Sequence, residues 1–476
     1  MDTKTKLFLL LTIALLVRLP NIVSPLIGVH SWRQADTASM ARNYIELDGS
    51  FGSPRVDYGG GAIIESEFPI YQYFISILYR LFGIHDIFGR IVSIIASLTM
   101  LLFFFYLIKK ITDETTAWWS TIVLGFLPTS VFYSRTFMPD SLMLMFTVIG
   151  LYYFVCWLEN QNKHYIIFSA ISIALACLVK ITSLYIGFIL LFLSWQYYRW
   201  KLFKNPSLLI YAVFVLGSVA AWYYHAHQNY LNGGVTVGIW EYGSDKWGNW
   251  YMLISFNFWE QLLFNRIATL HLTYIGFIVF TIGLFLKRAN SNERLFDFWI
   301  ISVFIYFLIV AKGNFVHDYY QLPLLPPAAF FIGKVFSRYL QIPLFPKVKT
   351  ILVSIALVGT IILSSIILID YYSAEDPRLS YDWNLAQVIN SSTSKDEMIC
   401  LHSQSDPTIF YLSHRRGYLV YSDLNLSDRL NELKKKKCTV FAGYYYAEPQ
   451  YQPLLIEEIR KRIPIFVNNE VFLVRL

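Results

Sequence analysis

The chain opens on an apolar run, LFLLLTIALLVRLPNIV (residues 7–23), and soon continues into the polar stretch HSWRQAD (residues 30–36). The run is close to the ~20 residues that a helix needs to cross ~30 Å of hydrocarbon. Asp36 therefore follows directly on a first membrane span. Ionisable groups at this depth are costly and are functional candidates for that reason.

The composition extends this interpretation to most of the chain. It is 56% hydrophobic and 18% aromatic but only 15% charged, against roughly 25% charged residues in soluble proteins. We predict a polytopic α-helical membrane protein with about eleven transmembrane helices. The expected spans are roughly 7–23, 87–108, 115–133, 139–157, 164–179, 182–198, 207–224, 267–286, 297–311, 321–340 and 350–369. The net charge of +7 does not indicate nucleic-acid binding, because the positive residues cluster in short loops between spans.

The same positive residues predict the orientation. They occupy alternate connections: Lys4, Lys6, Lys109, Lys110, Arg199, Lys201, Lys204, Lys287, Arg288, Lys347 and Lys349. The positive-inside rule places these loops and the N-terminus in the cytoplasm. An odd number of spans then sends the C-terminus outside. The stretch Val17-Arg18-Leu19-Pro20 is a poor cleavage site, so we expect the first span to be a retained anchor in the plasma (inner) membrane.

Two domains are predicted. Residues 1–369 form the transmembrane domain, with outer loops at 24–86 and 225–266. In the first loop, Ser31 followed by Gln34 is a capping-box pattern that predicts a short helix through Leu47. A second, aromatic helix at Tyr71–Phe82 is expected to lie along the membrane interface.

Residues 370–476 are predicted to form a small extracytoplasmic α/β domain. Apolar runs at Met398–Leu401, Thr439–Ala442 and Val471–Val474 indicate strands, and Asp428–Lys437 and Leu454–Arg462 indicate helices. Cys400 and Cys438 fall in this domain, as a disulfide or as reduced core thiols, and the sequence leaves both options open.

Asp36 and Asp140 are the candidate catalytic residues. Arg33 lies one helical turn before Asp36, so we expect this carboxylate to stay ionised and to serve as a general base. Asp140 follows Pro139 at the start of a span, where the helix dipole stabilises an anion. Each has a plain alternative: a structural Arg33–Asp36 ion pair, and an ordinary helix N-terminal charge. Together the two carboxylates could hold a divalent cation or divide the roles of base and orienter. The sequence leaves both options open, and we favour the one without a cofactor.

Cationic residues predicted on the same side of the membrane are the second group of candidate site residues. They are Arg90 at the start of the second span, Arg135, Lys180 in a tight turn, Lys312 and His317. Positive charge gathered there suits a phosphate leaving group, whose developing charge needs electrostatic stabilisation. The alternative for each is a side chain that snorkels to lipid headgroups.

With these residues assembled, the chain resembles the GT-C superfamily of membrane glycosyltransferases, and most closely the aminoarabinose transferase and protein mannosyltransferase branch. The family's first acidic motif, with a later Pro-Arg, is similar to Asp36 through Pro54-Arg55. Its Glu-Lys-Pro segment is similar to Glu67-Phe68-Pro69, and its second aspartate to Asp140. Its Tyr/Leu-Pro stretch before a late span is similar to His317–Pro326.

The resemblance implies a polyprenyl-phosphate-linked sugar donor, transfer with inversion, and a lipid, glycan or protein of the envelope as acceptor. Phe68 replaces a lysine that contacts donor phosphate in some relatives, so other cations must take that role. Our candidates for donor phosphate are Lys180, Arg90, His317 and Arg33. For substrate contacts they are Glu67, Arg135, Tyr319 and Tyr320.

Two rival functions remain at this point. A transporter or flippase of lipid-linked sugars would have charges through the membrane midplane and repeat symmetry, and the sequence has neither pattern. A scaffold subunit of envelope biosynthesis is the other rival. For all three functions we expect membrane lipids as partners and no nucleic acid.

Overall fold

The structure of the protein is a computed structural model, and it describes all residues except 1, 48, 237–243, 342–345, 404–405 and 446. The chain divides into two compact units. The helical unit comprises residues 1–20, 90–225 and 238–370, and the sheet unit comprises residues 21–89, 226–237 and 371–476. Each unit is described by itself.

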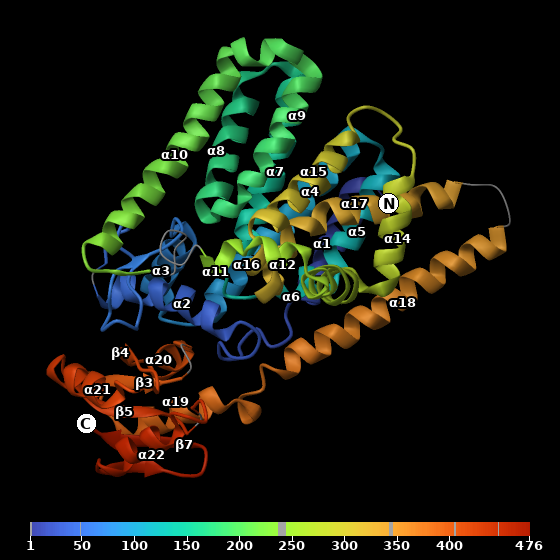
Figure 1. The fold of residues 1–476 in the computed structure, drawn as a ribbon. Helices are drawn as coiled ribbons and strands as arrows, with labels where there is room; N and C mark the ends of the chain where they lie inside the picture. Colours follow the sequence, from blue (N-terminus) through green and yellow to red (C-terminus); the bar gives the residue numbers. More distant parts are fainter. Residues whose placement is uncertain (1, 48, 237–243, 342–345, 404–405, 446) are drawn as a thin grey trace. The chain divides into compact units, whose positions relative to one another are not determined.

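The helical unit consists of helices and short turns throughout its described part (Figure 1). In chain order its elements are α1 (Thr3–Leu16), α4 (Ile87–Ile111), α5 (Glu114–Phe126), α6 (Pro128–Tyr133), α7 (Asp140–Asn160), α8 (Lys163–Val179), η1 (Ile181–Tyr185), α9 (Ile186–Tyr198), η2 (Arg199–Lys204), α10 (Pro206–Leu231), α11 (Ser244–Trp247), α12 (Trp250–Ile254), α13 (Phe256–Trp259), η3 (Glu260–His271), α14 (Thr273–Phe285), α15 (Arg294–Ile309), α16 (Ala311–Val316), η4 (Asp318–Leu324), α17 (Leu325–Gln341) and α18 (Pro346–Ser373).

Five of these helical segments are long and apolar enough to cross a membrane. They are Ile87–Ile111, Asp140–Asn160, Ile181–Lys204, Pro206–Leu231 and Ser354–Ser373. A bent pair, Phe256–His271 with Thr273–Phe285, raises the number to six among the described residues. Every predicted span overlaps helical structure, but 7–23 is helical only through Leu16 and 115–133 is divided between α5 and α6. Several of the helices are also short: α1 has 14 residues and α15 has 16. The expected number of eleven spans therefore stays a prediction.

The bend in that pair has a local cause. The two helices meet at an angle of 107°, and Thr273 at the junction has a φ of 59°. A β-branched residue in the left-handed region is strained. Thr273 is 1% exposed, so the surrounding packing holds it in this conformation and fixes the change of direction.

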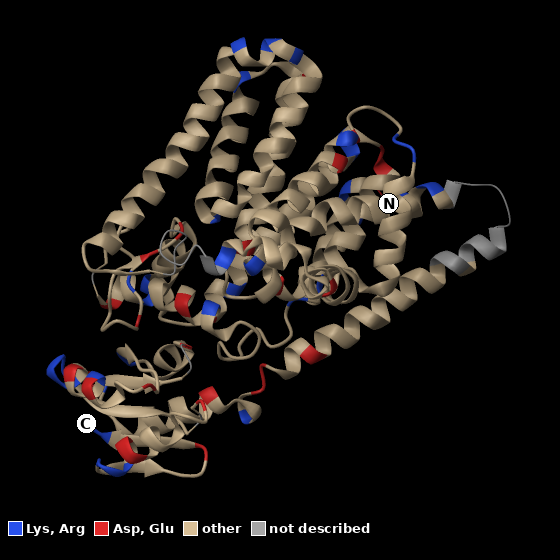
Figure 2. Ribbon diagram, viewed as in Figure 1, with Lys and Arg blue, Asp and Glu red and all other residues tan. Residues whose placement is uncertain are grey.

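Charged residues lie in the turn between α9 and α10 and not within α10. Arg199, Lys201 and Lys204 lie at the turn between α9 and α10, where Figure 2 shows a group of basic residues. α10 itself carries no Asp, Glu, Lys or Arg over its 26 residues. An uncharged helix that begins at a basic turn is typical of a membrane span.

Small residues allow two helix pairs in the helical unit to approach closely. A Cβ on Gly150 of α7 would lie 2.5 Å from Ile173 of α8, and one on Gly333 of α17 would lie 2.4 Å from the backbone nitrogen of Ser120 in α5. Ser169 Oγ also donates to the carbonyl of Gly150 at 2.8 Å. Helices that pack in lipid depend on such small residues and inter-helical hydrogen bonds.

The sheet unit combines the loop after α1 with the C-terminal tail. Its elements are α2 (Ser31–Glu46), β1 (Ile64–Glu65), α3 (Ile70–Phe82), β2 (Val235–Thr236), η5 (Pro377–Leu379), α19 (Tyr381–Ser392), β3 (Met398–His402), α20 (Thr408–Ser413), β4 (Arg416–Leu419), α21 (Leu426–Lys435), β5 (Cys438–Tyr444), α22 (Gln452–Arg460), β6 (Pro464–Val467) and β7 (Val471–Arg475). The helix predicted at Tyr71–Phe82 is present as α3, and the three predicted strands of the tail are present as β3, β5 and β7.

The tail is a three-layer α/β/α arrangement around a five-stranded sheet of order β4-β3-β5-β7-β6. Strands β4, β3 and β5 are parallel, and β7 and β6 are antiparallel to their neighbours. Residues alternate between the two faces, as the two-residue period of a strand requires. Cys400 and Phe441 face α21 and α22, whereas Leu401 and Ala442 face α19 and α20.

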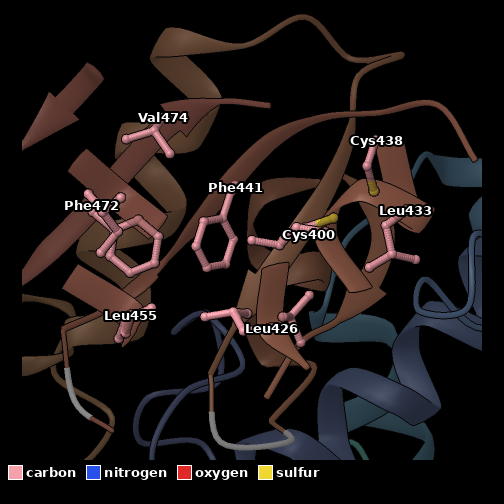
Figure 3. Packing of buried hydrophobic residues seen from close by; sticks show 11 residues of the cluster. Cys400, Leu426, Leu433, Cys438, Phe441, Leu455, Phe472 and Val474 are labelled. Carbon is pink, nitrogen blue, oxygen red and sulfur yellow. The ribbon is translucent and has the colours of Figure 1, made fainter. Parts of the chain in front are cut away.

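Cys400 and Cys438 are both free thiols in the core on the side of the sheet that α21 and α22 cover. The other two cysteines of the chain, Cys156 and Cys177, are also free and lie in the helical unit. Figure 3 shows the two sulfur atoms among apolar side chains. Burial and the neighbouring thiol raise the pKa of Cys400, which keeps it protonated. Of the two options left open by the sequence, the structure has the reduced core thiols.

The tail is joined to the loop after α1 by backbone hydrogen bonds. The amide of Gly60 donates to the carbonyl of Gly417 at 2.8 Å, and the amide of Gly417 donates to the carbonyl of Asp57 at 3.1 Å. Helix α20 packs against α2. The loop and the tail therefore share one compact unit.

A matched pair of leucines tests the sheet core. Leu426 is 2% exposed in the cluster of Figure 3, and Leu424 is 81% exposed two residues earlier. We expect Leu426→Ala to lower the free energy of unfolding by about 2–5 kcal/mol, because it leaves a cavity. Leu424→Ala should stay within about 0.5 kcal/mol of wild type. Chemical denaturation of the purified full-length protein measures both, and equal effects would contradict the packing described.

Candidate functional site

Asp36 is carried by α2, whose start differs from the predicted capping box. The helix begins at Ser31, and His30 is the N-cap residue in a left-handed conformation with no side-chain cap bond. Gln34 Nε2 instead donates to the carbonyl of Val29 at 3.2 Å. The expectation that Ser31 caps the helix was wrong, because the turn at His30 already brings Ser31 into the first helical position. The predicted end at Leu47 coincides with the C-cap residue.

The Asp36 carboxyl group is buried, with 3% of the residue exposed. Burial raises its pKa from 3.8 to about 8, Arg33 opposes this shift, and the negative charges of Asp406 and Asp57 add to it. The expectation that Asp36 stays ionised beside Arg33 is therefore wrong at neutral pH. Desolvation of the carboxylate outweighs one nearby guanidinium.

Arg33 is engaged elsewhere. Its Nη2 donates to Glu67 Oε2 at 2.6 Å, and the two side chains are 6% and 24% exposed. The structure thus joins two of the predicted site residues, Arg33 and Glu67, through an ion pair that was not foreseen. Glu67 thus pairs with the same guanidinium that lowers the pKa of Asp36.

A second ion pair, fully buried, fixes α2 about two and a half turns after Arg33. Arg42 Nη2 donates to Asp57 Oδ2 at 2.5 Å, and Asn43 Nδ2 donates to Asp57 Oδ1 at 3.0 Å. Arg42 Nη1 also donates to the carbonyl of Tyr411 at 3.2 Å, and its guanidinium lies 4.7 Å from the Tyr411 ring centre. This residue connects α2, the following loop and the tail.

Asp140 belongs to the helical unit, where it is the first residue of α7. Its Oδ1 accepts a short hydrogen bond from Lys180 Nζ. Asp140 is fully buried and Lys180 is 7% exposed. Lys180 lies in the extended turn between α8 and η1, as predicted. Lys180 was expected to serve donor phosphate, and the structure pairs it with the second candidate aspartate.

Aromatic residues from η4 surround this pair. Lys180 Nζ lies 4.5 Å from the ring centre of Tyr319 and 5.3 Å from that of Tyr320. His317 stacks on the same two rings, at 5.3 and 5.5 Å. The helical unit therefore brings Asp140, Lys180, His317, Tyr319 and Tyr320 into one cluster, and all five were candidates from the sequence.

Arg90 and Arg135 are also in the helical unit, and they are 1% and 0% exposed. Ser93 Oγ, one turn after Arg90, donates to the carbonyl of Thr136 at 2.8 Å. This bond ties the start of α4 to the segment that leads into Asp140. Burial excludes snorkelling to bulk solvent for both arginines within this unit.

The sequence missed two polar contacts. Tyr133 Oη donates to Asp318 Oδ1 at 2.5 Å, beside the predicted His317. In the sheet unit, His227 Nδ1 lies 2.9 Å from Glu65 Oε1. Asp318 lies in the segment His317–Pro326, so its acidic side chain could have been recognised from the sequence. The sequence carries no signal for the contact of His227 with Glu65, because it depends on the pairing of β1 with β2, which are far apart in the chain.

Among the described residues, no group of three or more His, Cys, Asp and Glu side chains is placed to hold a metal ion. Asp36 and Asp140, the pair considered for a divalent cation, belong to different units.

Substitutions in the Asp140–Lys180 pair test its burial. Lys180→Met should lower the free energy of unfolding by about 3–5 kcal/mol, because it leaves a buried charge without its partner. The double variant Asp140→Leu/Lys180→Met should recover much of that loss. Lys109→Met, in the exposed pair with Glu114, should cost at most about 1 kcal/mol. Thermal unfolding in detergent measures all three, and additive losses in the double variant would refute the pairing.

The pH dependence of stability tests the state of Asp36. Between its ordinary pKa of 3.8 and about 8, the folded protein keeps a proton that the unfolded chain has lost. The contribution of this group to stability therefore falls as pH rises through that window. We expect Asp36→Asn to gain stability relative to wild type between pH 5 and pH 8, by more than about 1 kcal/mol. Asp57→Asn, which leaves Arg42 without its carboxylate, should be less stable than wild type throughout.

Comparisons with known proteins agree on the fold. Residues 66–225 match the family described as dolichyl-phosphate-mannose-protein mannosyltransferase. The structure is similar to ArnT from Cupriavidus metallidurans, solved with bound undecaprenyl phosphate, with a TM-score of 0.69 at 12% identity, over 100% of this chain and 98% of that chain. No curated protein matches the chain.

Two further solved structures are similar. The oligosaccharyltransferase of Archaeoglobus fulgidus has a TM-score of 0.56 at 14% identity, over 94% of this chain and 70% of that one. The mycobacterial arabinofuranosyltransferase AftD has a TM-score of 0.57 at 13% identity, over 100% of this chain and 40% of that one. The resemblance predicted from the sequence is confirmed: the chain has the fold of the GT-C membrane glycosyltransferases.

Proposed function

We propose that this protein is an integral-membrane glycosyltransferase that moves a sugar from a polyprenyl-phosphate-linked donor to an extracytoplasmic acceptor, with inversion. The observation that carries the proposal is the similarity over the full chain to a transferase solved with undecaprenyl phosphate. The acceptor is a lipid, glycan or protein of the cell envelope. The enzyme lies in the plasma membrane with its N-terminus in the cytoplasm and its tail outside, which the basic turn between α9 and α10 supports.

Asp36 acts as the general base. It removes the proton from the acceptor nucleophile, which attacks the anomeric carbon of the donor. The bond between that carbon and the phosphate oxygen breaks, and polyprenyl phosphate leaves with the electron pair. A base is most effective when its pKa lies near the working pH, and the pKa of about 8 produced by burial is in that range.

Cations take up the charge on the departing phosphate. Lys180 and His317 serve from the cluster of the helical unit, with Arg90 buried in the same unit. Asp140 is a positioning residue in this proposal, because its carboxylate holds Lys180 Nζ. Arg33 serves from the sheet unit, where its pairing with Glu67 fixes its position. Arg135, Tyr319 and Tyr320 complete the substrate contacts.

One reconstitution experiment separates the proposal from its rivals. Purified protein in liposomes is given radiolabelled polyprenyl-phosphate sugars and envelope acceptors. We expect release of polyprenyl phosphate together with labelled acceptor. Movement of the donor across the bilayer without cleavage would instead show a flippase, and neither result would support a scaffold.

Asp36→Asn tests the base within that assay. We expect a loss of kcat of about 10²–10⁴-fold, since the amide cannot accept the proton. In wild type, kcat/KM should rise with pH to an inflection near the pKa of about 8 and then level off, because only the carboxylate is active. Turnover near that of wild type in Asp36→Asn would exclude this role. Asn43→Ala removes another buried polar side chain about two turns later on α2, and it is the control for general damage to the helix.

A further inference from the structure

The sheet unit contains a cavity of about 420 Å³ that the proposed reaction does not use. Its lining comes from both parts of the unit, the loop after α1 and the tail. Ligand pockets are typically ~300–1,000 Å³ and combine apolar and aromatic walls with a few placed polar groups. The polar and aromatic residues that line this cavity are Arg42, His85, Asp86, Trp383, Tyr411 and His414.

The charges around this cavity are balanced. Arg42 pairs with Asp57 at 2.5 Å and lies 3.8 Å from Glu46. His414 Nε2 lies 2.6 Å from the same Glu46, and Tyr411 Oη donates to Asp86 Oδ1 at 2.5 Å. Because the carboxylates already compensate the basic groups, the lining favours a neutral ligand over an anion.

Arg42 supports the wall of this cavity. It is 3% exposed, and its Nε faces Glu46 Oε2 at 3.8 Å, so other side chains must make the contacts with a ligand. Trp383 adds an aromatic surface, and the two histidines and Asp86 add groups that can donate or accept.

We propose that this cavity binds a neutral saccharide ring of the acceptor. The apolar C–H face of such a ring fits against Trp383, and its hydroxyl groups can exchange hydrogen bonds with His85 and Asp86. This inference rests on the proposed function and narrows its acceptor to a glycan or a glycan-bearing lipid. Arg42 lies six residues beyond Asp36 on α2, which is ~9 Å along the helix axis.

Direct binding tests the cavity without relying on turnover. Full-length protein in nanodiscs is titrated with methyl glucoside, N-acetylglucosamine and their β-linked disaccharides, and binding is followed by saturation-transfer difference NMR. We expect millimolar or tighter binding by at least one probe, weakened about tenfold by Trp383→Ala, since aromatic contacts contribute roughly 1 kcal/mol or more. Tyr381→Ala is the matched control, because this exposed ring on the same helix α19 does not line the cavity.

Each other outcome has a defined meaning. Absence of binding by every probe, or equal binding by Trp383→Ala and wild type, overturns the proposal. Displacement of the sugar by inorganic phosphate also overturns it, because the cavity would then be an anion site. Asp36→Asn should bind the saccharide as wild type does. If that variant still transfers sugar while the cavity binds its probe, the assignment of the base fails and the cavity stands.

Discussion

The requirement that every buried charge be compensated shapes both units of this protein. Removing an ion from water costs several kcal/mol even after relaxation, and a close partner of opposite sign offsets that cost where the geometry is good. Arg42 with Asp57, Lys180 with Asp140, and Lys334 with Glu293 all follow this rule, with both side chains of each pair less than 10% exposed. Asp36 follows the other route: it is buried among further carboxylates and takes up a proton. A group that gains or loses a proton near neutral pH is suited to proton transfer, whereas a firmly paired group is suited to holding a geometry.

Much of the fold was accessible from the sequence because its signals are local. Apolar length predicted the positions of the helices, and short apolar runs predicted β3, β5 and β7. The short strands β4 and β6 were missed: Arg416–Leu419 has only two large apolar residues, and Pro464–Val467 begins with a proline, which argues against a strand. Their place in the sheet is set by pairing with β3 and β7. The number of spans was harder, because a break such as Leu127-Pro128 divides one apolar run into two helices.

The candidate residues were easier to find than their partners. Asp140 and Lys180 were both named from the sequence, yet their contact joins positions 40 residues apart. The ionisation of Asp36 was misjudged for the same reason. Arg33 is near in sequence and lowers the pKa of Asp36, but burial, which the tertiary fold produces, raises that pKa by more. Sequence spacing reveals neighbours along a helix, while the protonation state depends on groups that only the tertiary fold assembles.

The tail illustrates this dependence most directly. Tyr411 lies 369 residues after Arg42 and accepts its hydrogen bond, and Asp406, just before α20, contributes to the raised pKa of Asp36. Helix α20 packs against α2, so the tail supplies part of the low-dielectric surroundings of the proposed base. A carboxyl group in water has a pKa near 4 and is a weak base. The raised pKa that suits Asp36 to the proposed role of base is therefore a property of loop and tail together. Without the packing of α20 against α2, Asp36 would be too acidic for that proposed role.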